Sequence, residues 1–173
     1  MTGIRLLDAA EAEARLPGLA ALLVDAVAGG ASVNFLAGFT HAEAEAFWRT
    51  QLPGLACGER HLLVALDAAG ELVGTVVLTL AQQPNAPHRA ELGKMLVHSA
   101  SRRQGLGRRL LAAAEDAARE HGRTLLMLDT ETDSAGERLY RACGWVALGV
   151  VPDHALRPDG RLAGTTVLYK RIS

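Results

Sequence analysis

A basic, glycine-rich segment in the middle of the chain is suited to binding phosphate. Arg102 is followed by Gly105 and Gly107, and the second glycine opens an apolar-periodic run typical of a helix. In such an arrangement several backbone N–H groups point to one place at the positive end of the helix dipole. Glycines lack the Cβ that would hold a ligand away. The segment therefore predicts a site for a ligand with a diphosphate, although an ordinary surface turn with basic residues has the same pattern.

Two other phosphate-binding loops compete with this interpretation. A dinucleotide fold is favoured by Asp129, which lies 24 residues after Gly105, near the offset of a ribose-binding acid. However, the third glycine of that pattern would fall on Leu110, and residues 98–104 separate the preceding strand from Gly105. A nucleoside-triphosphate loop requires Gly-Lys-Ser/Thr, which the segment lacks. The pattern therefore favours a different class of diphosphate ligand.

Hydrophobic periodicity predicts the elements that must position this loop. Strand-like runs occupy residues 4–7, 61–67, 71–80, 89–97, 124–128, 145–151 and 165–169. Helix-like runs occupy residues 8–28, 40–52, 106–121 and 134–144. This order predicts an α/β fold in a single domain over residues 1–173. Its sheet is mixed and mostly antiparallel, with about seven strands and about four helices.

Local signals set the expected ends and burial of these elements. The first helix is expected to be interrupted near Pro17, and the second to stop at Pro53. Capping-box patterns open the helices at Thr40 and Ser134. The apolar run 124–128 predicts a strand that is buried on both faces. We expect a loop with exposed aromatics Phe35 and Phe39 over residues 31–40, although core packing is the favoured role for both side chains. Residues 152–164 are expected to form a polar loop without strands.

The overall composition excludes several classes of function. The 173 residues are 49% hydrophobic with a net charge of −1, so no basic field favours nucleic acid. No run is long and apolar enough to span a bilayer, and the first residues lack the layout of a signal peptide. Cys57 and Cys143 have no metal-ligand spacing, so we expect reduced cysteines with a small packing role, a cytoplasmic location and no metal.

Two segments resemble the GNAT superfamily of N-acetyltransferases. Residues 95–107 are similar to its acetyl-CoA signature, Arg/Gln-x-x-Gly-x-Gly/Ala, which is matched here as Arg102-x-x-Gly105-x-Gly107. Residues 139–145, Leu-Tyr-Arg-Ala-Cys-Gly-Trp, resemble the Tyr-x-x-x-Gly-Phe/Trp segment of the same superfamily. The element order from residue 60 to the end also agrees. The stretch from Asp129 to Arg161 looks most like the branch that contains tabtoxin-resistance-type acetyltransferases.

The resemblance implies a binding site for acetyl-CoA. In that fold the signature strand and the next strand splay apart, and the pantetheine arm lies between them on exposed backbone, here Met95, Leu96 and Val97. The diphosphate would lie on the loop and helix start formed by Arg102, Arg103, Gln104, Gly105, Leu106, Gly107 and Arg108. The two arginines at 102 and 103 either add charge to the site or are solvated surface residues. Ser134 either contacts the pantetheine arm or only caps its helix.

The resemblance also implies catalytic roles. Tyr140 would protonate or stabilise the departing thiolate, although a packing role against the sheet also fits this residue. A backbone N–H near Met95 or Leu96 would polarise the thioester carbonyl. Glu91 or Asp129 would accept the proton of the amine, unless these acids only cap a helix or form surface pairs. Glu131 and Asp133 add negative charge nearby, which favours a cationic amine substrate.

These expectations describe an acetyl-CoA-dependent N-acetyltransferase that acts by direct transfer. The branch resemblance favours the amine of a small molecule over a protein, with no nucleic-acid or membrane partner. A homodimer is the expectation at family level, and the apolar final strands would allow one. The alternatives are a non-catalytic acyl-CoA-binding or sensing domain and an acetyltransferase for protein N-termini or lysines.

Overall fold

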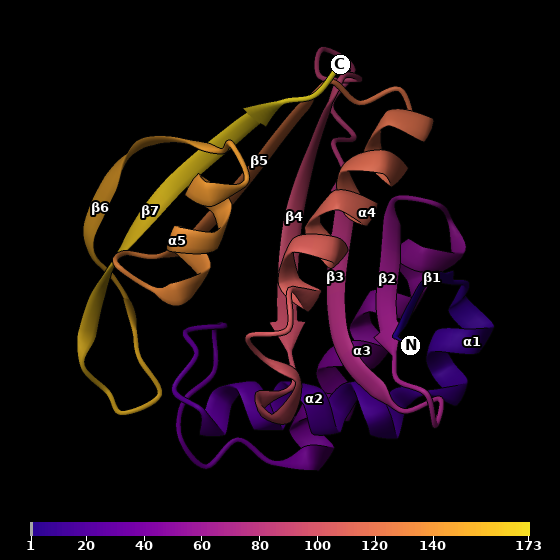
Figure 1. Ribbon diagram of the computed structural model, residues 1–173, viewed down its shortest axis with the longest axis vertical. Coiled ribbons are helices and arrows are strands. Elements are labelled where there is room, and N and C mark those ends of the chain that lie inside the picture. The colour runs from indigo at the N-terminus through magenta and orange to yellow at the C-terminus, as the bar shows by residue number, and fades with distance from the viewer. Residues whose placement is uncertain (1) are drawn as a thin grey trace.

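Seven strands form one open sheet in the computed structural model, which describes residues 2–173 (Figure 1). The strands are β1 (Gly3–Leu7), β2 (Arg60–Leu66), β3 (Leu72–Leu80), β4 (Arg89–Val97), β5 (Leu125–Glu131), β6 (Val146–Leu156) and β7 (Leu162–Arg171). The helices are α1 (Ala9–Ala14), α2 (Leu16–Ala28), α3 (His41–Ala56), α4 (Leu106–Glu120) and α5 (Ala135–Ala142), with a 3₁₀ turn η1 (Ser99–Ser101).

The sheet has the strand order β1-β2-β3-β4-β5-β7-β6. Only β4 and β5 pair in parallel, and every other neighbouring pair is antiparallel. The predicted mixed, mostly antiparallel sheet is therefore confirmed. The helix that links the two parallel strands is α4, as a crossover connection requires.

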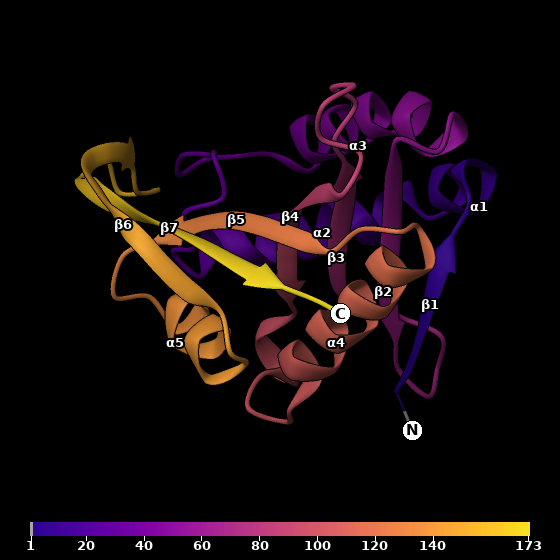
Figure 2. The same ribbon diagram turned by 90° about the horizontal axis from the view of Figure 1, so that it is seen from above.

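Helices cover both faces of the sheet and divide its core in two. Helices α4 and α5 lie on one face and α1–α3 on the other (Figure 2). Leu110 and Leu126 are fully buried in the core under α4. Trp48 and Leu23 are fully buried in the core under α2 and α3, where the Trp48 indole N–H donates to the Leu19 carbonyl at 3.0 Å. The apolar stripes of these helices therefore fix both layers.

The N-terminal helix is divided into two, which gives five helices where about four were predicted. An Asp8 capping box opens α1, and Arg15 lies between α1 and α2 with φ of −106°. Pro17 lies in the first turn of α2, where backbone N–H groups have no acceptor within the helix, so the N–H that proline lacks is not needed. The predicted interruption is confirmed, but it falls at Arg15 because Pro17 starts a helix rather than ending one.

Two helix-end predictions are corrected. Helix α3 continues past Pro53 to Ala56, because the Pro53 carbonyl accepts the Cys57 N–H at 3.0 Å and the last turn is thereby closed. At α5, Ser134 accepts the Glu137 N–H at 3.0 Å as predicted. The Glu137 carboxylate, however, accepts from the Asp133 N–H, so the reciprocal half of a capping box is not made to Ser134.

Burial differs from expectation at β5, whose second face is only partly covered. Leu126 and Leu128 are buried, whereas Leu125 and Met127 are half-buried. Helix α2 packs against β3 and β4 and α3 packs against β2, so these helices do not extend over β5. The prediction of a strand buried on both faces is therefore wrong.

The last two strands are longer than predicted. They continue through much of residues 152–164, where a loop was expected, and turn only at residues 157–161. The register shifts between Val151 and Ala155, and Asp153 adopts a φ of 52°. This irregularity lets β6, an edge strand, contain Pro152 without breaking the ladder.

The loop position of Phe35 and Phe39 suggested exposure, but the favoured core-packing role is confirmed for both. Phe35 and Phe39 are half-buried against the α2–α3 core, and their rings stack with centroids 4.0 Å apart. Both cysteines are free. Cys143 packs against the α4-side core, whereas Cys57 is exposed at the end of α3 and has no packing role. The loop that carries the two phenylalanines is therefore held by its own aromatic contact.

Strands β4 and β5 separate soon after they start. Their pairing joins residues 89–91 to residues 125–127 and then stops, and the strands diverge in Figure 1. A bulge in β4 accompanies the separation, with Lys94 at a φ of 45° and a register shift against β3. Ala90 packs under α4, whereas Leu96 packs under α2. The bulge therefore changes which positions of β4 face each core.

Candidate functional site

A cleft of about 680 Å³ opens where β4 and β5 diverge. It lies among the end of β4, the loop before α4, the end of β5, the first turns of α5 and the segment after α2. Strands β4 and β5, the loop and start of α4, and α5 contribute most of the lining residues, which include Met95, Leu96, Val97, Arg102, Arg103, Gly105, Leu106, Gly107, Arg108, Thr130, Glu131, Ser134, Leu139 and Tyr140. The structure therefore brings together most of the residues that the sequence assigned to one site.

The loop before α4 is shaped by two left-handed residues. Arg103 has a φ of 61° and Gly105 a φ of 74°. Gly105 is the N-cap of α4, and its carbonyl accepts the Arg109 N–H at 3.2 Å. The amides from Gly105 to Arg108 precede that first helical bond, so the helix itself gives them no acceptor. They form the anion-binding end of an exposed helix dipole.

Gly107 has a second structural role that the sequence did not reveal. A Cβ at this position would lie 2.9 Å from Cδ2 of Leu139 on α5 and 3.6 Å from Cε of Met95. The absence of a side chain therefore lets α4 start close to α5, at the inner end of the cleft. Gly105, by contrast, has open space around its Cα and is required for its backbone conformation.

Arginine side chains surround the mouth of the cleft. The Arg102 guanidinium donates through Nε to the Val97 carbonyl at 3.1 Å and is thereby held beside β4. Arg103 and Arg108 are exposed and line the cleft, and neither forms an ion pair within residues 2–173. Gln104 does not line the cleft, and its amide lies 3.4 Å from the Ala100 carbonyl. Positive charge is thus gathered around the free amides.

The last residues of β4 expose backbone to the cleft. Met95, Leu96 and Val97 lie beyond the part of β4 that pairs with β5, so that edge of the strand has no β5 partner. The bulge upstream is held by the Thr75 hydroxyl, which donates to the Lys94 carbonyl at 2.8 Å. Backbone N–H and C=O groups on this edge are therefore available to an extended ligand, as in β-strand addition.

Tyr140 and Ser134 reach the cleft from α5. Tyr140 is 7% exposed and packs against Trp145, with ring centroids 5.9 Å apart. Burial raises the pKa of the Tyr140 phenol above its ordinary value, and the negative charge of Asp129 adds to the rise. The phenol is therefore a protonated hydrogen-bond donor at neutral pH. Ser134 lines the cleft while its hydroxyl caps α5.

The two predicted proton acceptors occupy different places. Glu91 lies in the paired part of β4, opposite Met127, where the strands have not yet separated. Asp129 lies on β5 beyond the paired part, and its charge influences both Tyr140 and Lys94. Neither carboxylate lines the cleft. Asp129 is the nearer of the two to the separated strands.

Lys94 is a half-buried cation that sequence analysis did not single out. Its Nζ lies 5.1 Å from the centre of the Phe47 ring and 5.9 Å from that of Phe35. Burial lowers the pKa of the ammonium, and the Asp129 carboxylate opposes that change. The ordinary strand pattern around Lys94 contains no sign of this, because the position of the bulge depends on the pairing with β3.

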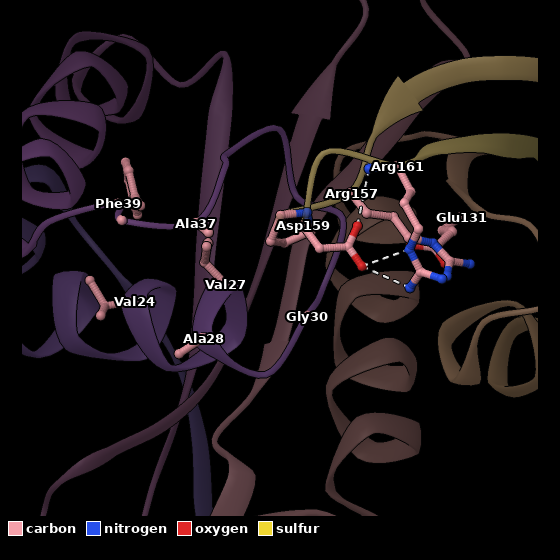
Figure 3. Close-up of a pocket in the computed structure, with 12 residues that line it drawn as sticks. Val24, Val27, Ala28, Gly30, Ala37, Phe39, Glu131, Arg157, Asp159 and Arg161 are labelled. Atoms are coloured by element: carbon pink, nitrogen blue, oxygen red, sulfur yellow. Dashed lines mark hydrogen bonds and ion pairs between the residues drawn. The ribbon is translucent and has the colours of Figure 1, made fainter.

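A second cavity of about 410 Å³ adjoins the cleft (Figure 3). It shares Gly30 and Glu131 with the cleft and is lined further by Arg157 and Arg161 from the end of the β6–β7 hairpin. The sequence had assigned Glu131 only a general negative charge and had given these two arginines no role. They were missed because residues 157–161 meet the segment after α2 only in the folded chain.

Comparison with known proteins places this site in a family context. The model of the acetyltransferase (GNAT) family matches residues 31–145. Over 98% of this chain and 99% of the other, the structure resembles ribosomal-protein-alanine N-acetyltransferase from Brucella melitensis, with 26% identity and a TM-score of 0.78.

No helix within residues 2–173 has the length and hydropathy to cross a membrane.

Two further solved structures contain acetyl-CoA. One is yncA from Salmonella typhimurium, with 20% identity over 100% of this chain and 95% of the other, and a TM-score of 0.78. The other is a phosphinothricin acetyltransferase from Sinorhizobium meliloti, with 18% identity over 99% of this chain and 89% of the other, and a TM-score of 0.77. At these identities the likeness concerns the fold.

Proposed function

The chain belongs to the GNAT family of acetyltransferases, and we propose that it transfers the acetyl group of acetyl-CoA directly to the amine of a small molecule. The observation that carries this proposal is the cleft between β4 and β5. Free helix-start amides, exposed strand backbone and a protonated phenol line it together. These are the groups that an acyl-CoA thioester requires for binding and for departure of its thiolate.

The residues of the cleft fit acetyl-CoA. The amides from Gly105 to Arg108 and the side chains of Arg103 and Arg108 suit its diphosphate. The open edge of β4 suits the amide groups of its pantetheine arm, and the cleft volume of about 680 Å³ is that of a ligand site. Acetyl-CoA supplies the activated acetyl group. The protein binds and orients it.

The chain's own groups would assist the transfer. A backbone N–H near Met95 or Leu96 would stabilise negative charge on the thioester oxygen. Tyr140, whose phenol is protonated at neutral pH, would stabilise or protonate the departing sulfur through its O–H. The amine attacks the carbonyl carbon, the C–S bond breaks, and one proton leaves the nitrogen. No covalent enzyme intermediate is required.

The assignment of Glu91 or Asp129 as the acceptor of that amine proton is still a prediction. The structure favours Asp129, because it lies beyond the paired part of β5 whereas Glu91 lies within the paired part of β4. If Asp129 accepts the proton, Asp129→Asn lowers kcat at neutral pH and Glu91→Gln leaves it unchanged. Steady-state rates of thiol release from acetyl-CoA measure both variants. Full rates in both would remove these carboxylates from the mechanism.

The proposed small-molecule acceptor is supported by the second cavity. Its volume of about 410 Å³ and its location beside the cleft suit a compact ligand. A protein acceptor is a second candidate, because the relative from Brucella melitensis is a ribosomal-protein-alanine N-acetyltransferase. An extended protein terminus needs an open groove rather than a small cavity, so the geometry supports the small molecule more strongly.

A screen of acceptors tests the proposed function. The full-length protein is incubated with acetyl-CoA and either small amines or peptides that begin with alanine, and free thiol is followed. We expect rapid release with a small amine and none with the peptides. Calorimetry should show acetyl-CoA binding and no binding of NADPH. Tight acetyl-CoA binding without transfer to any acceptor would instead identify a binding or sensing domain.

A further inference from the structure

We propose that the second cavity binds its acceptor as a zwitterion, that is, an amine that also carries a carboxylate or a similar anion. Glu131 would contact the ammonium group, and Arg157 with Arg161 would contact the anion. This inference rests on the proposed function, because it names the class of amine that receives the acetyl group. An α-amino acid is the simplest ligand of that class.

Glu131 is placed to receive an ammonium group at the border of the two cavities. It lines both the cleft and the second cavity, so a group bound to it lies on the side from which the thioester is reached. Its side chain is 15% exposed and forms an ion pair with Arg157, whose Nη2 lies 2.5 Å from Oε1. Carboxylates have more than one acceptor position, so Glu131 can hold an ammonium as well as this guanidinium.

Arg157 has donor capacity that its present contacts do not use. Its Nε is buried and has no hydrogen-bond partner in the described part of the chain. The Arg157 side chain lines the cavity and is 36% exposed, so a ligand in the cavity can reach its other N–H donors. A guanidinium presents its donors in a planar fork that matches the two oxygens of a carboxylate. An anion of that geometry in the cavity would therefore find a matching partner in Arg157.

The charges around the cavity balance. Arg161 donates through Nε to Asp159 at 2.8 Å, and its Nη2 lies 2.7 Å from the same carboxylate, beside the Arg157–Glu131 pair (Figure 3). Two guanidinium groups and two carboxylates leave no net charge on the cavity wall. A simple cation or a simple anion would disturb that balance, whereas a zwitterion meets one charge of each sign. The arrangement thus favours a ligand that is itself neutral overall.

The opposite wall of the cavity is apolar. Val24 and Val27 from α2 and Phe39 from the following loop form it (Figure 3). That loop is joined to the hairpin end by the Ala37 N–H, which donates to the Pro158 carbonyl at 2.9 Å. The wall therefore holds a fixed position against the charged side. The rest of the acceptor molecule is expected to be small and apolar.

Matched acceptors test the proposal. The protein is assayed with acetyl-CoA and three kinds of acceptor: the protein amino acids, β-alanine and 2-aminoethylphosphonate. Each acceptor is compared with a neutral analogue, in which an amide replaces the carboxylate or an alkyl group replaces the phosphonate. We expect at least one anionic amine to be acetylated with a kcat/KM at least about tenfold above that of its neutral analogue, because the analogue leaves the arginine unpaired. Equal rates for acid and neutral analogue would overturn the proposal.

Variants locate the effect. Arg157→Gln should raise the KM for the anionic amine about tenfold or more. The ratio of kcat/KM between the anionic amine and its neutral analogue should fall toward one, while the Kd for acetyl-CoA stays unchanged in calorimetry. Arg161→Gln should also lower this kcat/KM ratio, and it replaces Arg157→Gln as the test if that variant does not fold. Arg138→Gln, an exposed arginine of α5 that donates to the Asp133 carbonyl, should change nothing. Undiminished discrimination in both cavity variants would contradict the assignment.

Glu131→Gln separates the two ends of the ligand. It should lower kcat/KM for anionic and neutral amines alike, because both lose the contact to the ammonium group.

The proposed function fails if acetyl-CoA does not bind or if no amine of any kind is acetylated. The zwitterion proposal alone fails if acetyl-CoA binds and only amines without an acidic group are acetylated.

Discussion

Tyr140 carries the clearest single-residue chemistry of the chain. Its ring is buried beside Trp145, and its phenol faces the cleft with a pKa above the ordinary value. The phenol is therefore protonated at neutral pH and can donate a hydrogen bond to a developing thiolate. The same burial also gives the residue a packing role, so an informative substitution must retain the ring.

Tyr140→Phe retains the ring and removes the proton donor. If the phenol protonates the sulfur, kcat should fall by about a hundredfold, within the range of a lost general acid. The Kd for acetyl-CoA and the melting temperature should change little. Tyr169→Phe is the matched control, because Tyr169 is the other tyrosine of the chain and lies on β7. An unchanged kcat in Tyr140→Phe would leave the residue with packing alone.

His61 predicts how stability depends on pH. It stacks on His121 with ring centroids 4.0 Å apart, and its Nε2 is buried with no partner among residues 2–173. Burial lowers the pKa of His61, and the nearby His121 and Arg123 lower it further. Because the folded pKa lies below the unfolded one, the folded state is disfavoured as pH falls below about 6.5.

Urea unfolding at pH 7.5, 6.5 and 5.5 measures this dependence. The free energy of unfolding should decrease toward pH 5.5, and His61→Phe should make the decrease smaller. His88→Gln, at an exposed position, should leave the dependence as it is. The same slope in the His61 variant and the unmodified protein would show that other groups cause it.

At the scale of elements, the start of α4 is the proposed binding site for the diphosphate. Its amides face the cleft because the chain enters the helix through Gly105 in the left-handed region. Another residue at this position would favour a different backbone angle and turn the amides away. The function of the loop therefore depends on backbone conformation, to which the arginine side chains add charge.

Gly105→Ala tests the importance of that conformation. We expect a loss of about 1 kcal/mol in the free energy of unfolding, and a weaker Kd for acetyl-CoA. Gly58→Ala is the control, because Gly58 has a φ of 78° with open space around it but lies outside the cleft. It should lose similar stability and keep its affinity for acetyl-CoA. Equal affinities in both variants would argue against the amide site.

At the scale of the whole molecule, the sheet ends in an exposed apolar edge. Strand β6 closes one side of the sheet and exposes Val146, Leu148 and Val150 by 49%, 62% and 53%. An edge strand with such side chains is a site for association or aggregation unless it is covered. We propose that a second copy of the chain covers it, as the sequence had led us to expect of the final strands.

Sedimentation velocity tests this dimer. The unmodified protein should sediment as a dimer, and Leu148→Asp should sediment as a folded monomer, because a charge in the apolar contact is costly to bury. Leu6→Asp provides the control at the opposite edge of the sheet, where Leu6 on β1 is 49% exposed. It should remain dimeric. A monomeric unmodified protein would exclude the interface.

Much of the architecture could be predicted because it rests on local signals. The alternating and continuous apolar runs predicted the seven strands, and the capping box at Thr40 predicted the start of α3. The errors occurred where neighbours decide. Pro53 ends no helix because Cys57 closes the last turn, and β6 contains Pro152 because a bulge at an edge strand tolerates it.

The sequence by itself determined the fold, the family and the loop before α4, because Arg102, Gly105 and Gly107 lie within a few residues of one another and act through the backbone between them. Only the tertiary structure decided which charged groups meet beside that loop. Glu131 and Arg157 are separated by a helix and a strand, and their contact depends on how the β6–β7 hairpin folds back beside the divergence of β4 and β5. Contacts between residues far apart in the chain are fixed by packing and strand register, which no local pattern encodes.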